Sequence, residues 1–183
     1  MIYIIIVIIA LLIIYGFITY NSLVKLNNQL KEAFSTMDVF LKKRWDLIPN
    51  IVGTVKGYAK HETDTLEGIV KERNNYNKMT TDEKIDTNNN INENIPKLFA
   101  LAEAYPDLKA NKNFMDLSKQ LKTVEDDIAN SRKYYNGAVK VFNNKVEMFP
   151  SNIIAKILGY KSQKMFTIEE SERENIKIDL NKE

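Results

Sequence analysis

The sequence contains no cysteine, and its 183 residues include one histidine and one tryptophan. Without thiols the chain cannot form a disulfide framework, an iron–sulfur cluster or a thiolate zinc site, and it cannot be acylated as a lipoprotein, although this absence does not identify the compartment. The six glycines and four prolines are also few, and the prolines stand far apart. Because these residue types end helices and make turns, their scarcity favours long helices over short strands.

Neither sign of charge dominates the chain. Lysine and arginine number 26 against 24 aspartates and glutamates, which gives a formal net charge of +2. Such a balance does not select a polyanion, and we predict no nucleic-acid partner. With 44% hydrophobic residues, a chain of 183 residues is long enough to form one domain with a sizeable core.

One long run without charge lies at residues 2–18 and reads IYIIIVIIALLIIYGFI. At about 1.5 Å per residue it spans roughly 26 Å, and extension to Tyr20 approaches the ~30 Å of a bilayer core. No lysine or arginine precedes the run, and the GFITYNS that follows is a poor cleavage site for signal peptidase. We therefore interpret residues 1–20 as an uncleaved transmembrane anchor, with the lipid bilayer as its partner through residues 2–20.

The orientation of the anchor follows from the cations around it. They lie after the apolar run, at Lys25, Lys31 and residues 42–44. The positive-inside rule then predicts a single-pass protein of the cell membrane, with its N-terminus outside and its main domain in the cytoplasm. The opposite topology, with the domain outside the cell, is the alternative.

After the anchor, apolar residues recur every three or four positions, which predicts amphipathic helices. No glycine or proline lies between Gly16 and Pro49, so the anchor should continue directly into the first helix of the domain. We expect this helix to end at a tight reversal near residues 44–46. Asp46 would then cap a second helix over residues 51–76, with Pro49 in its first turn.

Two further helices are predicted, one at residues 96–105 that Pro106 ends and one at residues 114–149 that Pro150 stops. The intervening stretch at residues 79–94 reads MTTDEKIDTNNNINEN. It is polar and rich in asparagine, so we expect it to be a long, exposed and mobile connection.

The remaining residues predict a short amphipathic turn at 153–158 and a charged tail at 160–183. Four amphipathic helices without a strand pattern indicate an all-α fold. We expect a transmembrane helix at residues 1–20 followed by an antiparallel four-helix bundle over residues 21–159.

Two stretches resemble sites of chemistry. The cations at residues 42–44 could bind phosphate or anionic lipid, but in an upright helix Lys43 would lie about 35 Å beyond Tyr20, several Debye lengths from the bilayer. We interpret them as a solvated helix end. His61 and Glu62 are adjacent, whereas a di-metal bundle needs a Glu-x-x-His pair on each of two helices. We therefore expect no metal, no cofactor and no catalytic residue.

Several polar residues fall on or beside the apolar stripes: Glu62, Arg73, Glu125, Arg132 and Asn136. Buried charges are costly unless they are paired, so we expect these side chains to form pairs between helices that set the register. A different possibility is an inter-helix polar pocket formed by Glu62, Arg73 and Arg132, which would serve a small-ligand sensor or an enzyme.

The chain resembles the LemA family of bacterial membrane proteins over nearly all residues after 20. The motifs are DLIPN, VKGYAKHE, AEAYPDLKAN and an R-x-x-YN with a downstream FP, and the last two comprise Arg132, Tyr135, Asn136, Phe149 and Pro150. The chain departs from the family at Gly53, where a larger polar residue is usual, in the asparagine-rich stretch 79–94, and in its tail, which keeps Phe166 but lacks a proline.

The resemblance implies a single N-terminal transmembrane helix, a very short extracellular N-terminus and a cytoplasmic antiparallel four-helix bundle, and it supplies no reaction. Some members are encoded beside a heat-shock membrane metalloprotease, which suggests a link to envelope stress or membrane quality control. We therefore expect a non-enzymatic scaffold or adaptor. Its partner would be an unidentified protein, a membrane protease or a second copy of the chain.

Overall fold

The structure, a computed structural model, describes residues 1–58, 76 and 78–166. All regular elements in this part of the chain are helices, so the predicted all-α class is confirmed there. The helices are α1 (Ile2–Lys56), α3 (Thr81–Ala104), α4 (Pro106–Lys109), α5 (Lys112–Glu147) and α6 (Ser151–Ile157).

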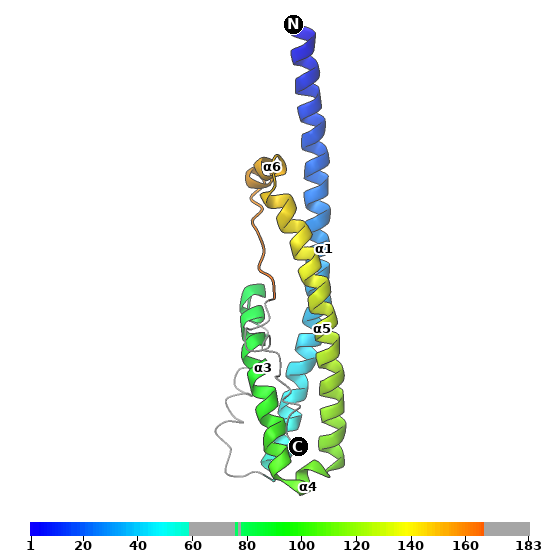
Figure 1. Cartoon of the computed structure of the whole chain (residues 1–183), viewed down its shortest axis with the longest axis vertical. Helices are drawn as coiled ribbons and strands as arrows, with labels where there is room; N and C mark the ends of the chain where they lie inside the picture. The colour runs from blue at the N-terminus through cyan, green and yellow to red at the C-terminus, as the bar shows by residue number, and fades with distance from the viewer. Residues whose placement is uncertain (59–75, 77, 167–183) are drawn as a thin grey trace, which may run out of the picture.

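Three long helices, α1, α3 and α5, lie side by side and make the body of the molecule (Figure 1). Contacts between them give the directions. Phe34 of α1 packs on Tyr135 of α5, and Arg44 pairs with Glu125, so rising numbers on α1 meet falling numbers on α5 and these two helices are antiparallel. The four-helix arrangement remains a prediction, because residues 59–75 of its expected second helix lie outside the described residues.

The N-terminal part of α1 stands clear of the other helices (Figure 1). Its side chains are exposed, for example Ile2 at 68% and Leu12 at 64%. In the described part of the chain, α1 is the one helix long and apolar enough to cross a membrane. Further along the same helix Leu23, Met37 and Leu41 are fully buried. The predicted straight passage from the apolar run into the first core helix is therefore confirmed.

The predicted reversal near residues 44–46 is wrong. Helix α1 continues through Asp46 and Pro49 to Lys56. An interior proline costs a helix about 3 kcal/mol, because it lacks the N–H that would donate to the carbonyl four residues earlier. The last two and a half turns of α1 offset this cost by burying four aliphatic side chains, each worth about 1.5–3 kcal/mol. These are Ile48, Ile51, Val52 and Val55.

The predicted mobile connection at residues 79–94 is also wrong, since α3 begins at Thr81 rather than at Pro96, which lies inside it. A capping box starts the helix: the Glu83 N–H donates to Thr80 Oγ1 at 3.4 Å, and the Thr80 N–H donates to Glu83 Oε2 at 2.7 Å. The hydrogen bonds that the Thr80 N–H and the Thr80 hydroxyl donate to Glu83 Oε2 lower the pKa of the Glu83 carboxyl. Residues spaced at helical intervals then face the core, namely Ile85, Asn88, Ile91 and Ile95.

Helix α5 confirms the predicted fourth helix in type and extent. Its N-cap is Asn111, whose Oδ1 accepts from the Phe114 N–H at 3.1 Å, and it ends at Glu147 before Pro150. Phe149 does not continue the buried stripe as predicted, because the helix has already ended and the ring is 79% exposed.

The segment after α5 is partly folded onto it. The predicted turn at residues 153–158 is the short helix α6, and residues 160–166 of the predicted tail return along α5 with Phe166 buried. Residues 167–183 lie outside the described residues.

Substitution of Pro49 tests the continuity of α1. Pro49→Ala should raise the free energy of unfolding by about 2 kcal/mol, because alanine restores an interior helical hydrogen bond. Urea unfolding of the detergent-solubilised full chain, followed through the fluorescence of Trp45, measures the change. Pro106→Ala is the matched control: Pro106 occupies the first turn of α4, where proline is favourable, so no gain is expected. An unchanged or lower stability of Pro49→Ala would instead support a reversal at this position.

Candidate functional site

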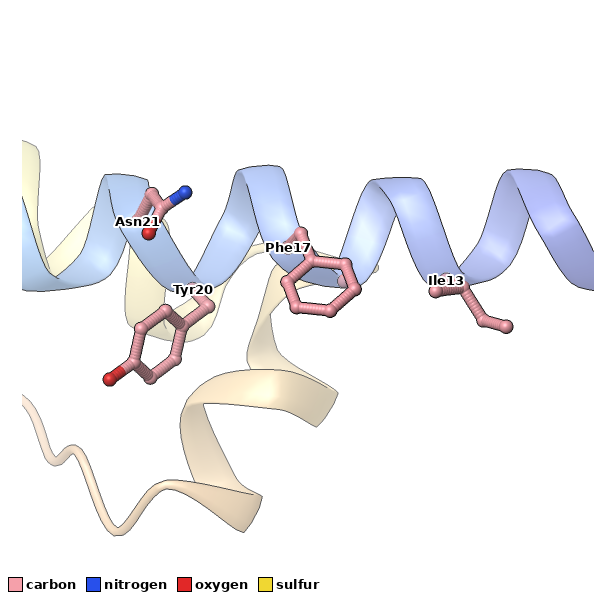
Figure 2. Close-up of a pocket in the computed structure, with 5 residues that line it drawn as sticks. Ile13, Phe17, Tyr20 and Asn21 are labelled. Carbon is pink, nitrogen blue, oxygen red and sulfur yellow. The ribbon is translucent and has the colours of Figure 1, made fainter.

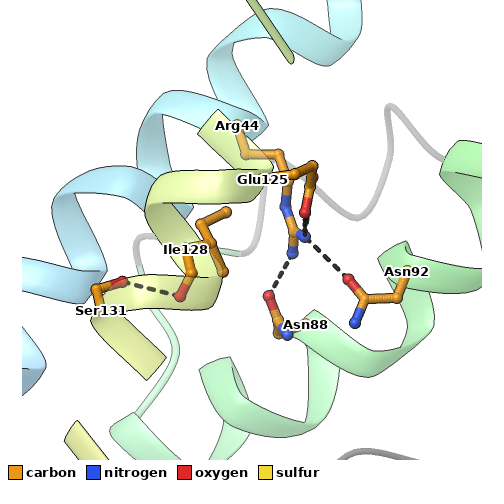
Figure 3. A network of polar contacts seen from close by, with 6 residues as sticks. All are labelled: Arg44, Asn88, Asn92, Glu125, Ile128 and Ser131. Atoms are coloured by element: carbon orange, nitrogen blue, oxygen red, sulfur yellow. Dashed lines mark hydrogen bonds and ion pairs between the residues drawn. The ribbon is translucent and has the colours of Figure 1, made fainter. Parts of the chain in front are cut away.

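Arg44 is a fully buried charged residue and lies where α1, α3 and α5 meet (Figure 3). One guanidinium nitrogen donates to Asn92 Oδ1 at 3.0 Å and to Glu125 Oε2 at 3.2 Å. The other donates to Asn88 Oδ1. The Nε–H has no hydrogen-bond partner among the described residues. The side chain thus joins three helices through one charged group.

The electrostatics of this cluster depend on Glu125. Burial lowers the pKa of Arg44, the nearby charge of Arg132 lowers it further, and the Glu125 carboxylate raises it. A guanidinium nevertheless keeps its proton in a protein, so the positive charge has to be balanced inside the fold. Glu125 supplies the balancing charge, while Asn88 and Asn92 supply neutral acceptors. The side chain of Glu125 is itself 33% exposed, so the pair extends from the core to the surface.

The interpretation of residues 42–44 as a solvated helix end is wrong for Arg44 and correct for Lys42 and Lys43, which are exposed. The sequence contains the signal that separates them. Arg44 lies three residues after Leu41 and four before Ile48, so it belongs to the buried stripe. The expectation that Glu125 forms an inter-helix pair is confirmed, with Arg44 as the partner.

A second polar contact joins α3 to α1 six residues before Arg44. Asp38 of α1 accepts a hydrogen bond at 2.7 Å from the hydroxyl of Tyr76, which precedes α3. It also forms an ion pair with Lys84 of α3, with Nζ and Oδ2 2.8 Å apart. Burial raises the pKa of Tyr76, as does its hydrogen bond to Asp38, so the phenol stays protonated and acts as a donor. The Lys84 ammonium also lies 4.9 Å from the centroid of the Tyr76 ring. The Arg44 cluster and the Asp38–Lys84 ion pair together fix where α3 lies along α1.

Arg132 lies at a hollow of about 270 Å³ next to the Arg44 cluster. Its guanidinium stacks 5.7 Å from the centroid of Phe166, and its Nε–H lacks a hydrogen-bond partner among the described residues. Glu125 lines the same hollow, so the structure brings together two of the polar residues predicted to lie near the core. His61, Glu62 and Arg73, the other residues singled out from the sequence, lie outside the described residues.

One charge of each sign, from Arg132 and Glu125, lines the hollow. Arg44 pairs with Glu125 and is fully buried, and it is not one of the lining residues. In the described part of the chain, no three histidine, cysteine, aspartate or glutamate side chains gather as metal ligands. The described residues that line the hollow thus place the Arg132 side chain beside the Glu125 carboxylate and Asn92.

Two asparagines of α5 hold the returning segment by its backbone. Asn136 donates to the Phe166 carbonyl at 2.8 Å and accepts from the Phe166 N–H at 2.9 Å. Asn143 makes the same pair with Gln163, at 2.9 Å and 2.8 Å. The two asparagines are seven residues apart and thus share a helix face. We call this arrangement the asparagine clasp.

The clasp corrects the expectation for Asn136, whose partner is a backbone segment instead of a side chain on another helix. Tyr135 strengthens it, because the phenol donates to the Lys164 carbonyl at 3.1 Å. Burial raises the pKa of Tyr135 to about 12, so the hydroxyl remains a donor at neutral pH. Asn143 was not singled out from the sequence, since a contact with a backbone leaves no complementary residue type to find.

The model of the LemA family matches residues 33–180. The chain belongs to the LemA family. The match confirms the resemblance found in the sequence and includes the Arg44 cluster, the hollow and the clasp. It begins after the exposed apolar part of α1, which is thus outside the matched range of this LemA family member.

Curated relatives extend the comparison. Over 158 residues the chain is 27% identical to Protein LemA of Metamycoplasma hominis, a match that covers 85% of this chain and 72% of the relative. Over 175 residues it is 22% identical to each of the magnetosome proteins MamQ 1 and MamQ 2 of Paramagnetospirillum magneticum, covering 80% of this chain. The match spans only 64% of the length of these two magnetosome proteins.

Removal of the Glu125 carboxylate tests the Arg44 cluster. Glu125→Ala should lower the free energy of unfolding by about 3 kcal/mol, because it leaves a buried guanidinium without its counter-charge. The double variant Arg44→Met/Glu125→Met should recover most of this loss, since no charge is left buried. Asp126→Ala, at an exposed neighbouring position, is the control and should change stability by no more than about 0.5 kcal/mol. Equal losses for the Glu125 and Asp126 variants in urea unfolding would contradict the assignment.

Proposed function

We propose that this LemA family member is a membrane-anchored, non-enzymatic scaffold that presents its helical domain to a protein partner. The observation that carries the proposal is the continuity of α1, which is an exposed apolar rod at one end and a core-forming helix at the other. A single helix of this kind transmits the position of the anchor to the domain without a flexible linker. The domain is then held at a defined distance from the bilayer.

The pairing of charges in and beside the core supports a scaffold over an enzyme. Arg44 is paired with Glu125, and Asp38 with Lys84, so these groups hold helices together. By contrast, apolar side chains remain exposed on the outer faces of α1 and α5, with Val39 at 62% exposure and Val141 at 52%. Exposed apolar positions on a rigid helical body are suited to contacts with another helix.

The setting of the scaffold is the cell membrane. Exposed lysines follow the apolar run, including Lys25 and Lys31, and support a cytoplasmic domain with the N-terminus outside. The partner is a membrane protein such as a protease, or a second copy of the chain, in envelope stress or membrane quality control.

Site-specific crosslinking in intact cells tests the scaffold. The chain has no cysteine, so single cysteines at Val39 and Val141 can carry a photoactivatable reagent without background. We expect discrete crosslinked products from these positions, identified by mass spectrometry as a protein partner or a second copy. Cysteines at Lys31 and Lys140, exposed polar positions that lie about 80° and 100° around the helix from Val39 and Val141, are the controls and should give weaker products.

The same cysteines report the topology. A membrane-impermeant maleimide should label them only after the cells are opened, and labelling of intact cells would place the domain outside. Products that are absent, or that are equal at the apolar and the control positions, would contradict a scaffold that binds through these faces.

A second function, the sensing of a small ligand, is favoured by one observation: Arg132 lines the hollow, and its Nε–H has no hydrogen-bond partner within the described part of the chain. Calorimetric titration of the full chain with inorganic phosphate tests it. Binding that weakens at least tenfold in Arg132→Gln, and is unchanged in the exposed control Lys133→Gln, would establish an anion site. Heat equal to that of dilution would remove this candidate.

A further inference from the structure

We propose that α6 and the turn before it form a second membrane contact, which lies in the headgroup region of the bilayer beside the anchor. This proposal rests on the anchor of the proposed function and adds a second lipid-binding surface to it. The surface, which we call the interfacial patch, consists of Met148, Phe149, Ile153, Ile157 and Leu158.

The side chains of the interfacial patch face outward. Phe149 is 79% exposed and Ile157 78%. Ile153 and Ile157 are four residues apart, so they share one face of α6. The inward face of the same helix carries small buried residues, Ser151 and Ala155. A seven-residue helix that is apolar on its outer face has no reason to expose that face to water.

The position of α6 explains this exposure. It packs against α1 next to the turns that carry Phe17 and Tyr20, at the end of the apolar run (Figure 2). On this part of α1 lies an open apolar hollow of about 560 Å³, lined by Ile13, Gly16, Phe17, Tyr20 and Asn21. The helix that carries the interfacial patch therefore lies beside the end of the run that is proposed to enter the membrane.

The length of the anchor sets the level at which α6 lies relative to the bilayer. From Ile2 to Phe17 the helix rises about 22 Å at 1.5 Å per residue, which is less than the ~30 Å of a hydrocarbon core. The bilayer therefore has to extend at least to the level of Phe17 for the apolar run to cross it. Because α6 lies at that level, its outer face meets the boundary between acyl chains and headgroups.

The charges next to the patch fit the same placement. Lys156 and Lys161 are exposed on either side of its last residues. Long lysine side chains at such a boundary keep their ammonium groups among the headgroups while their carbon chains lie along apolar surface. Amphipathic helices that lie in a membrane interface show this combination of an apolar face and flanking lysines.

The fold holds α6 in place from both sides. On one side it follows α5 directly, and on the other Tyr160 packs on Phe142 at 5.8 Å between ring centroids. The chain then enters the asparagine clasp at Gln163. The patch is thus a fixed feature of the domain, and its height relative to the anchor is set by packing.

Spin labels in the reconstituted full chain test the proposal. Single cysteines are placed at Ile157 and Phe149 in the patch, at Leu12 in the anchor, and at Met115, which is 54% exposed in the first turn of α5, at the end of that helix away from α6. The chain is inserted into nanodiscs of phosphatidylcholine and phosphatidylglycerol. Collision rates of each nitroxide with oxygen and with a water-soluble nickel complex are then measured.

We expect the ratio of oxygen to nickel collisions at 149 and 157 to exceed the ratio at 115 several-fold and to approach that at 12. A ratio at 149 and 157 equal to that at 115, with 12 still in lipid, would overturn the second contact and leave the anchor standing. A water-accessible label at 12 would overturn the anchor and this inference together. Labels at 149 and 157 shielded from both reagents and broadened by spin–spin coupling would show that a second copy covers the patch, which also overturns it.

Discussion

The ion pair between Arg44 and Glu125 constrains the arrangement of the three long helices. The guanidinium keeps its charge in the core, so only registers that bring an acceptor to each side of it are stable. Helix α5 contributes the carboxylate and α3 contributes Asn88 and Asn92. A shift of α5 by one residue would turn Glu125 by about 100° and leave Arg44 unpaired. Apolar stripes alone would not discriminate between neighbouring registers so strongly.

Much of the fold follows from periodicity. The stripes of α1 and α5 extend over many turns, so their type and direction were predictable, as was the direct passage from the apolar run into the core helix. Two helix boundaries were predicted wrongly, the reversal near residues 44–46 and the start of α3. In both cases burial of apolar side chains outweighs the local sequence signal. Pro49 suggested a helix start, but the burial of the following aliphatic residues outweighs a missing hydrogen bond. The many asparagines of α3 suggested a polar loop, although isoleucines recur there at helical spacing and the T-x-x-E pattern of a capping box precedes them.

The candidate site was predictable only in part. Glu125 and Arg132 attracted notice as charges beside apolar stripes, and the structure brings both to one hollow. Arg44 was hidden by its two lysine neighbours, since composition suggests a basic patch whereas spacing assigns only one of the three to the core. The asparagine clasp could not be found from sequence. Both asparagines bind backbone groups, and any residue type except proline presents the same N–H and C=O at the clasped positions.

The proposed membrane contacts and the Arg44 cluster together would determine the orientation of the domain relative to the membrane. A single transmembrane helix fixes the height of a domain but leaves its tilt and rotation free. A second contact through α6, displaced to one side of α1, would restrict both. Arg44 lies about 36 Å beyond Tyr20 along α1, and there it ties the same α5 whose other end carries α6. Since α5 is thus secured in its first half and at its C-terminal end, the outer faces of α1 and α5 would be presented at a set angle to the membrane.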